Sequence, residues 1–263
     1  MDYLKRLRKD ICEIFQAPTG IYYMPNEQNI RLGNALIIGP DDTPYEGGFY
    51  HFAMKIPNIY PMEPPKLRFL TSDPHRLVRF HPNLYPDELV CLSVINTWQG
   101  NSWTATQSIT SLLIGIQSLL DRNSLREEPA IEPTAEAHQK YNICVAHENI
   151  RIATLYLLHH NPHSEFQRTM ESYFCDHLDK YLKFCVNHFK YDGKIITAPF
   201  YTRFKVTCNF RGLYQSLLDE YRVLAPRYHT PEQISNNGIF SNHAEIQPTP
   251  KIRIRFRPKI FPT

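Results

Sequence analysis

Apolar side chains recur every three or four positions at the start of the chain. This spacing predicts an amphipathic helix over residues 3–15 that buries one stripe in a core. The stripe consists of Leu4, Leu7, Ile11 and Ile14 or Phe15. The opposite face is crowded with basic residues, namely Lys5, Arg6, Arg8 and Lys9. Asp2 is placed to cap this helix, and residues 17–20, which include proline and glycine, end it.

Strand-like runs follow the first helix. Residues 30–38 and 66–71 are two of them, and residues 48–56 show the clearest alternation of apolar and polar side chains. The links are short, and residues 41–48 have turn chemistry throughout, so we expect an antiparallel meander. Residues 57–65 contain too many prolines for a helix or a central strand.

Periodicity disappears between residues 80 and 103, which predicts a long structured loop. Loops of this length in compact domains tend to carry function. Helical spacing returns over residues 109–119. The chain then has a mostly helical pattern, over residues 134–160, 164–190 and, more briefly, 212–223.

The end of the chain has a different composition. Residues 229–250 are polar and rich in proline and asparagine, and residues 251–263 alternate basic and apolar side chains. The second segment is compatible with an added edge strand, with a tether to an acidic partner and with disorder. We therefore expect a partly flexible tail over residues 229–263.

Composition narrows the class of protein. The chain has 263 residues, of which 42% are hydrophobic, enough for one sizeable core and a smaller second one. A net charge of +3 is too weak to indicate nucleic-acid binding. No apolar run is long enough to span a bilayer, and the charged residues 1–10 hold no apolar stretch of a secretory signal. We expect a soluble protein of a reducing compartment, with no membrane partner.

The six cysteines are scattered, without a CxxC pair or the Cys/His spacing of a zinc site, so we expect free thiols and no metal. Most should be buried or inert. Cys91 differs because it lies in a polar segment, residues 81–93, between the predicted sheet and a helix. A reactive cysteine needs partial exposure, and we expect this location to supply it. A thiol that only receives an acyl group from another thioester needs no dedicated base, because that exchange is nearly isoenergetic.

Five sequence motifs, with two tryptophans and an apolar helix after the last, occur in an order that resembles the ubiquitin-conjugating enzymes. They are Gly-Pro at 39–40, Thr-Pro-Tyr-Glu-Gly-Gly-Phe at 43–49, Tyr-Pro-Met-Glu-Pro-Pro at 60–65, His-Pro-Asn at 81–83 and Cys-Leu-Ser at 91–93. The resemblance covers roughly residues 1–160. The long loop 95–103 and a helical extension to about residue 228 resemble the Z-type members of the family.

The resemblance implies an α+β fold. Its parts are an N-terminal helix, a four-stranded antiparallel meander, an active-site loop and C-terminal helices, with an added helical extension. A ubiquitin-conjugating catalytic core would span residues 1–160 and the helical C-terminal extension residues 161–228, before the tail. The implied activity is that of a transferase with a cysteine thioester carrier, which accepts a modifier from an activating enzyme and passes it to a substrate lysine.

The resemblance also assigns roles to single residues. Cys91 matches the thioester cysteine. Asn83 matches an asparagine beside it, and two roles stay open: a donor to the oxyanion formed when an amine attacks, or support of the loop through backbone bonds. His81 and Pro82 are implied as structural residues of the loop, and a general-base role for His81 is the less favoured alternative.

Glu128 matches an acidic position that faces the incoming lysine. A lysine amine must lose a proton before it can attack, and a nearby carboxylate can orient and deprotonate it. Glu127 is an alternative for this role, and a solvated turn without a chemical role is another.

Partner-binding residues are implied at two places. The basic face of the first helix, with Lys5, Arg6 and Lys9, would meet the activating enzyme, and the alternative is a solvated charged face. Met62 and Ala105 would meet ligases, although Met62 could simply pack under the prolines. The run Thr104-Ala105-Thr106 departs from the Ser-Pro-Ala common in the family, so the usual choice of ligase does not transfer. We expect Trp98 and Trp103 to pack in the core or its loops.

The implied partners are ubiquitin or a ubiquitin-like modifier, an activating enzyme of the general or the dedicated second type, ligases and protein substrates. We expect no bound cofactor, because no phosphate-binding glycine loop occurs and ATP is consumed by the activating enzyme. The expected location is cytoplasm and nucleus. Two alternatives remain: an inactive ubiquitin-binding variant, which usually lacks the cysteine, and a scaffold in which Cys91 is a buried thiol, which its polar neighbours argue against.

Overall fold

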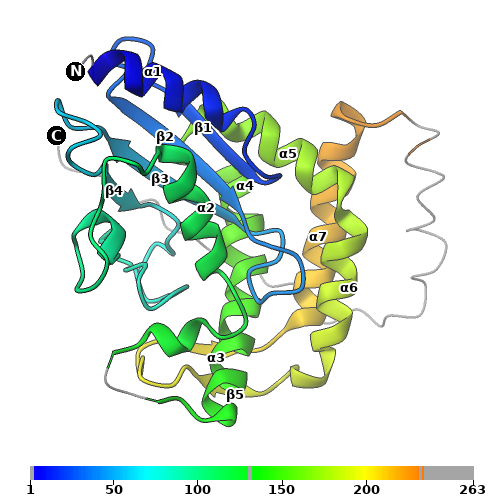
Figure 1. Ribbon diagram of the computed structural model, residues 1–263. Helices are drawn as coiled ribbons and strands as arrows, with labels where there is room; N and C mark the ends of the chain where they lie inside the picture. The colour runs from blue at the N-terminus through cyan, green and yellow to red at the C-terminus, as the bar shows by residue number, and fades with distance from the viewer. Residues whose placement is uncertain (1–2, 130–131, 231–232, 234–263) are drawn as a thin grey trace, which may run out of the picture.

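Four short strands form one sheet in the computed structural model, which describes residues 3–129, 132–230 and 233. They are β1 (Ile21–Pro25), β2 (Leu32–Ile38), β3 (Phe49–Lys55) and β4 (Lys66–Phe69). Each strand pairs antiparallel with the next, in the order β1-β2-β3-β4, which confirms the meander (Figure 1). Ile37 lies opposite Tyr50, and Phe52 lies opposite Phe69, so large side chains pair across the strands.

Helices precede and follow the sheet. The α-helices are α1 (Tyr3–Ile14), α2 (Ile109–Leu119), α3 (Ala135–Glu148), α4 (Leu157–His159), α5 (Gln167–Asp176), α6 (Leu178–His188) and α7 (Phe210–Leu224), and the π-helix η3 (Asn149–Tyr156) joins α3 to α4. The short 3₁₀ turns are η1 (Ser93–Ile95), η2 (Ser124–Glu127), η4 (Ser164–Phe166), η5 (Phe189–Tyr191) and η6 (Ala225–Arg227). The predicted α+β class is thereby confirmed. None of the described helices has the length and apolar character needed to cross a membrane.

Local side-chain chemistry sets where the helices begin. The Ser108 hydroxyl accepts a hydrogen bond from the Ser111 backbone N–H, and the Ser111 hydroxyl accepts one from the Ser108 N–H. This reciprocal pair starts α2 at the residue predicted from the apolar spacing. Thr134 and Asn209 cap α3 and α7 in the same way, each accepting from the backbone N–H three residues on.

The C-terminal part differs from the sequence prediction in two places. The helix predicted over residues 164–190 is interrupted at His177, whose Nδ1 lies 2.9 Å from the Tyr173 carbonyl. A short hairpin of β5 (Ile195–Thr197) and β6 (Lys205–Thr207) was not predicted, because three residues a strand show no clear alternation. The hairpin packs against α3.

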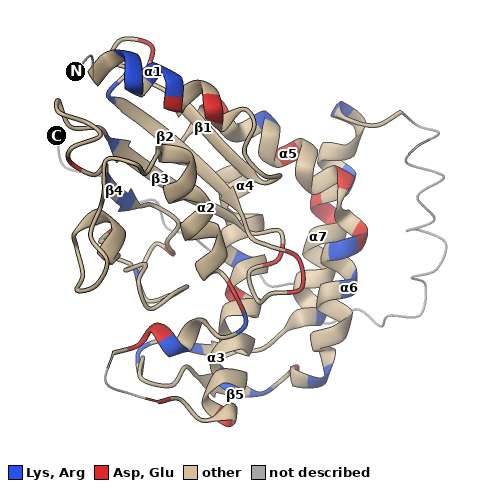
Figure 2. Ribbon diagram, viewed as in Figure 1, with Lys and Arg blue, Asp and Glu red and all other residues tan. Residues whose placement is uncertain are grey.

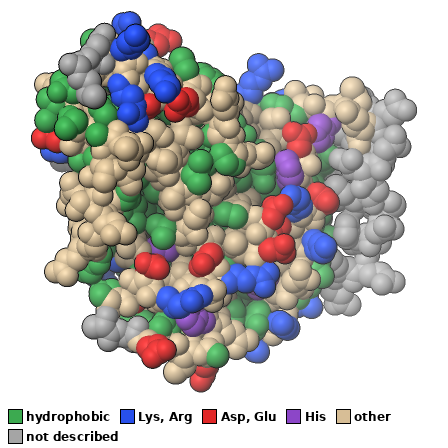
Figure 3. Space-filling view, viewed as in Figure 1, with side chains coloured by type: hydrophobic (Ala, Val, Ile, Leu, Met, Phe, Trp, Pro, Cys, Tyr) green, Lys and Arg blue, Asp and Glu red, His purple; other side chains and the backbone are tan. Residues whose placement is uncertain are grey.

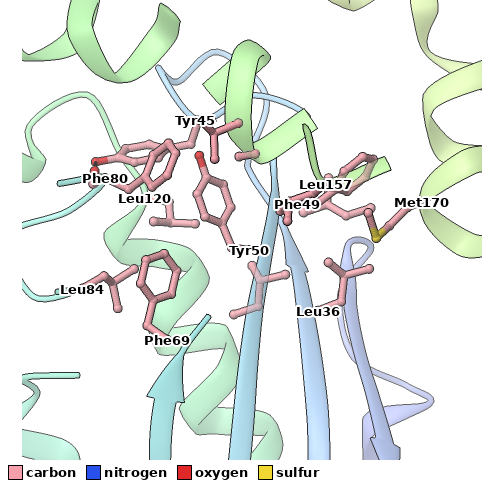
Figure 4. Close-up of a cluster of buried hydrophobic side chains, with 14 of the residues drawn as sticks. Leu36, Tyr45, Phe49, Tyr50, Phe69, Phe80, Leu84, Leu120, Leu157 and Met170 are labelled. Carbon is pink, nitrogen blue, oxygen red and sulfur yellow. Dashed lines mark hydrogen bonds between the residues drawn. The ribbon is translucent and has the colours of Figure 1, made fainter. Parts of the chain in front are cut away.

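Helices cover both faces of the sheet (Figure 1). One face packs against α2, and the other is covered by the C-terminal helices, where the rings of Phe49 and His51 contact Tyr173 and Phe166. Figure 4 shows Leu36 and Phe49 of the sheet beside Leu157 and Met170 of these helices.

The buried apolar side chains of both halves form one continuous cluster among the described residues. The division into a core over 1–160 and an extension over 161–228 stays a prediction. The predicted tail lies outside the described residues, apart from residues 229, 230 and 233.

Candidate active site

Asn83 and Cys91 are tied together by two hydrogen bonds across the loop that follows the sheet. The Cys91 N–H donates to the Asn83 carbonyl at 2.9 Å, and the Asn83 Nδ2 donates to the Cys91 carbonyl at 2.7 Å. Leu84, next to Asn83, forms isolated bridges with His81 and Val90. The two motifs that are eight residues apart in the sequence therefore lie side by side.

Thr97 holds the loop from the other side of Cys91. Its hydroxyl donates to the Val90 carbonyl at 2.8 Å and accepts from the Leu92 N–H at 2.9 Å. The sequence analysis did not single out Thr97. Its only signal was its place in the long loop, because a hydroxyl that bonds backbone groups five and seven residues away has no sequence motif.

His81 is fully buried beneath this loop. Its Nδ1 accepts a hydrogen bond from the Asn83 N–H at 3.1 Å, and burial lowers the pKa of the ring to about 3. The ring is therefore neutral at physiological pH and does not face a substrate. Pro82 is buried as well, and its carbonyl accepts a hydrogen bond from the Arg79 guanidinium.

Cys91 is only 7% exposed, so the expectation of partial exposure is wrong. Two polar groups around it bond the backbone rather than water: the Asn83 amide N–H donates to the Cys91 carbonyl, and the Thr97 hydroxyl donates to the Val90 carbonyl. A polar sequence therefore folds into a closed loop. Of the other cysteines, Cys12 is exposed, and burial raises the pKa of Cys144 to about 12.

A cleft adjoins the loop on the side of Asn83. It runs between the residues after Cys91 and helix α2, and its lining includes Asn83, Ser93, Trp98, Ser111 and Glu127. Trp98 is 50% exposed in this wall, so it is not the packing residue we expected. Trp103 is buried, as predicted.

The two candidate acidic residues face different surroundings. Glu127 is exposed and lines the cleft that Asn83 also lines. Glu128 is half-buried, and its carboxylate accepts a hydrogen bond from the hydroxyl of Tyr201, far along the chain. The role of Glu128 toward a lysine stays a prediction.

The residues predicted to bind partners lie near one another in the structure. Met62 is 55% exposed, so it does not pack under the prolines. The Trp103 Nε1 donates to the Pro61 carbonyl at 2.7 Å, which joins the proline-rich segment to the loop containing Ala105. Ala105 is half-buried there.

Basic residues occur along α1 (Figure 2), and a group of basic side chains gathers over this helix at one corner of the surface (Figure 3). Arg6 turns inward: it donates to the carbonyls of Ala105 at 3.1 Å and Gln107 at 2.8 Å, and its hydrogen bond to Asp10 raises its pKa. Lys5 and Lys9 are exposed, and Lys9 pairs with Glu13 at 3.5 Å. Arg6 therefore fastens α1 to the neighbouring loop.

No cluster of three or more histidine, cysteine, aspartate or glutamate side chains that could hold a metal occurs within the described part of the chain.

The comparison with known proteins agrees with this geometry. Residues 6–150 match the family model described as ubiquitin-conjugating enzyme, so the chain belongs to the ubiquitin-conjugating enzymes, a family of transferases. This confirms the resemblance and the enzyme class inferred from the sequence.

Within that family the chain is similar to proteins named ubiquitin-conjugating enzyme E2 Z. It is 35% identical to the one from Xenopus tropicalis over 229 residues, which are 84% of this chain and 71% of the relative. It is 36% identical to the one from Danio rerio over 230 residues, 84% of this chain and 67% of the relative. For the one from Homo sapiens the identity is 38% over 204 residues, 75% of this chain and 57% of the relative.

Proposed function

We propose that Cys91 carries ubiquitin or a ubiquitin-like modifier as a thioester and passes it to a substrate lysine. The observation that supports this most directly is the pair of hydrogen bonds that joins Asn83 to Cys91 beside an open cleft. The family membership makes ubiquitin conjugation the general activity. The alternatives of an inactive ubiquitin-binding variant and of a scaffold are not favoured.

The reaction has two steps. The Cys91 thiolate attacks the thioester carbonyl carbon on the activating enzyme, a new C–S bond forms, and the activating enzyme's thiolate leaves. A lysine amine then attacks the same carbon, the amide C–N bond forms, and the Cys91 thiolate leaves. The amine loses its proton to a base, for which Glu128 is the proposed group. The protein needs no bound cofactor in this scheme, because ATP is consumed upstream.

Access to the thiol is part of the proposal. Cys91 is 7% exposed, so its sulfur reaches a large acyl donor only if the side chain or its loop shifts. In the structure Asn83 holds the carbonyl of Cys91 and Thr97 holds the N–H of Leu92.

A charging assay tests the thioester. The protein would be incubated with an activating enzyme, ubiquitin and ATP, and run on a non-reducing gel with Cys91→Ala and with Cys12→Ala, the exposed cysteine, as the matched control. We expect a reductant-sensitive band in the wild type and in Cys12→Ala, and none in Cys91→Ala. The general and the dedicated second activating enzymes would be run in parallel, each with ubiquitin and with a ubiquitin-like modifier.

The outcomes separate the hypotheses. Charging by the second activating enzyme alone would support a Z-type partner choice. No band with either enzyme, in a protein that binds ubiquitin, would support the inactive variant instead. A band that persists in Cys91→Ala would refute the assignment of Cys91.

The partners follow from the exposed groups. We assign Lys5 and Lys9 to the activating enzyme and Met62, with Ala105 beside it, to ligases. Met62→Ala should weaken stimulation by a ligase while charging stays normal, and loss of charging would contradict this assignment. We also propose a location in cytoplasm and nucleus, which imaging of the tagged full chain would test.

A further inference from the structure

Tyr201 reaches from the C-terminal hairpin to the segment that carries Glu128. It lies in the turn between β5 and β6, and its hydroxyl donates to the Glu128 carboxylate across 73 residues of sequence. In Figure 1 the yellow hairpin runs alongside the green turn of residues 124–129. The C-terminal extension therefore contacts a residue of the proposed active site.

The phenol can only act as a donor in this contact. Burial and the neighbouring carboxylate raise the pKa of Tyr201 well above its usual range, so its hydroxyl keeps its proton throughout the pH range in which the protein works. A hydrogen bond from a hydroxyl to an ionised carboxylate is stronger than a neutral one. Glu128 is thus held at one of its two oxygens.

Tyr201 is itself fixed by a stack of side chains. The Arg79 guanidinium lies 3.2 Å from the centre of the Tyr85 ring and 5.5 Å from that of Tyr201. The rings of Tyr141 and Tyr201 are 5.9 Å apart, and the Tyr141 hydroxyl donates to the Arg79 carbonyl at 3.0 Å. These contacts leave the Tyr201 side chain little freedom to rotate.

Arg79 connects this stack to the loop of Cys91. Its guanidinium donates to the carbonyl of Pro82, the residue before Asn83. The Glu128 carboxylate and the Asn83 amide are therefore fixed relative to each other through Tyr201 and Arg79. By contrast, Glu127 is exposed at the cleft.

We propose that Tyr201 is a positioning residue for lysine transfer: it fixes one oxygen of Glu128 and leaves the other available to the incoming amine. The inference rests on the proposed function. An amine has to be both deprotonated and aimed, and a carboxylate locked in one rotamer does both faster than one that rotates. A thiol nucleophile ionises more readily than an ammonium, so charging and transfer to a thiol do not depend on this contact.

Single-turnover discharge of a pre-charged protein tests the proposal. Tyr201→Phe keeps the ring in the stack and removes only the hydroxyl. We expect it to slow discharge to free lysine about tenfold, the rate equivalent of one hydrogen bond to a charged group. Charging and discharge to a small thiol should stay within about twofold of the wild type. Glu128→Gln should slow lysine discharge by about 10²-fold.

A double-mutant cycle separates positioning from a general structural role. In the Glu128→Gln background, Tyr201→Phe should cause no further loss, because the carboxylate it positions is gone. Loss of charging or of thiol discharge in Tyr201→Phe would show a structural role only and overturn the proposal. The proposal is also overturned if Tyr201→Phe discharges to lysine at the wild-type rate, or if the losses of Tyr201→Phe and Glu128→Gln add in the double variant. It is likewise overturned if Glu127→Gln, and not Glu128→Gln, slows discharge to lysine. Failure of the wild type to charge would instead refute the proposed function.

Discussion

Asn149 joins the segment around β3 to the helical segment η3, and its removal should loosen the packing of these two parts. It is the first residue of η3 and is fully buried. Its Oδ1 accepts from the Tyr50 hydroxyl at 2.6 Å, and its Nδ2 donates to the Glu46 carbonyl at 2.8 Å. A Cβ at Gly48 would come within 1.9 Å of the Asn149 Oδ1, so the amide can lie in this position only because residue 48 is glycine.

The expected magnitude follows from the partners left behind. Asn149→Ala leaves the buried Tyr50 hydroxyl unpaired, which costs about 1–3 kcal/mol, and breaks the bond to Glu46, worth about 1 kcal/mol. We therefore expect the free energy of unfolding to fall by about 2–4 kcal/mol, a large share of the roughly 5–15 kcal/mol typical of a domain.

Urea unfolding would measure this loss. Tryptophan fluorescence reports on Trp98 and Trp103 near the active site, and far-ultraviolet circular dichroism reports mainly on the helices, most of which are C-terminal. We expect the two signals to change together in the wild type, because Tyr181 of α6 also donates a buried hydrogen bond to Gly47, at 2.6 Å. The matched variant is Tyr50→Phe, which should lose about 1–3 kcal/mol alone.

The double variant decides whether the reasoning holds. Once Asn149 is alanine, the Tyr50 hydroxyl has no partner there, so removing it with Tyr50→Phe should add no loss and should recover most of the about 1–3 kcal/mol that the unpaired hydroxyl costs. Fully additive losses, a loss below about 0.5 kcal/mol in Asn149→Ala, or two separate transitions in the wild type would each refute the role of Asn149 in joining β3 to η3 within one cooperative unit.

Three further predictions concern stability. Asn83→Ala and Thr97→Val should each lower the free energy of unfolding by about 1 kcal/mol, because each variant loses a hydrogen bond that holds the loop. If Thr97→Val is destabilised and Asn83→Ala is not, Asn83 acts as a donor to the oxyanion and not as a support of the loop. Burial raises the pKa of Cys144 to about 12, so the thiol loses its proton in the unfolded state at a lower pH than in the folded state. The free energy of unfolding therefore falls as the pH rises above ~9. Cys144→Ala should reduce the slope of the free energy of unfolding against pH by up to about 1.4 kcal/mol per pH unit, measured by denaturant titrations at pH 9–11. Burial lowers the pKa of His51 to about 3, so the neutral ring contributes its full stability above pH ~6.5, and this contribution is lost as the pH falls toward 3. His51→Leu should make the free energy of unfolding fall less steeply between pH 6.5 and 3. An unchanged slope would contradict the lowered pKa of His51.

The sequence predicted those parts of the fold whose pattern is local. The apolar stripe of α1 and the alternation in β3 give the helix and the sheet directly. The His-Pro-Asn and Cys-Leu-Ser motifs located the loop and, with it, the family. The break at His177 was missed because the apolar spacing continues through it from α5 into α6.

The parts that could not be predicted depend on contacts between distant residues. Tyr201 contacts Glu128 across 73 positions of sequence, and no local sequence pattern near either residue predicts this contact. The burial of Cys91 has the same origin. A polar loop is expected to face water, but the Asn83 amide N–H and the Thr97 hydroxyl bond the backbone of the loop itself, and only the folded geometry shows this.

The same inward use of polar groups limits which residues can recognise partners. Arg6 belongs by position to the basic face of α1, yet its guanidinium donates hydrogen bonds to Asp10 and to two backbone carbonyls of the loop around Ala105. Substituting it would disturb that loop, so a loss of partner binding in such a variant would not show that a partner touches Arg6. The side chains of Met62 and Lys5 are exposed instead. Recognition by partners is therefore best sought at the outward-facing residues, and the inward-facing ones determine the shape on which those residues are displayed.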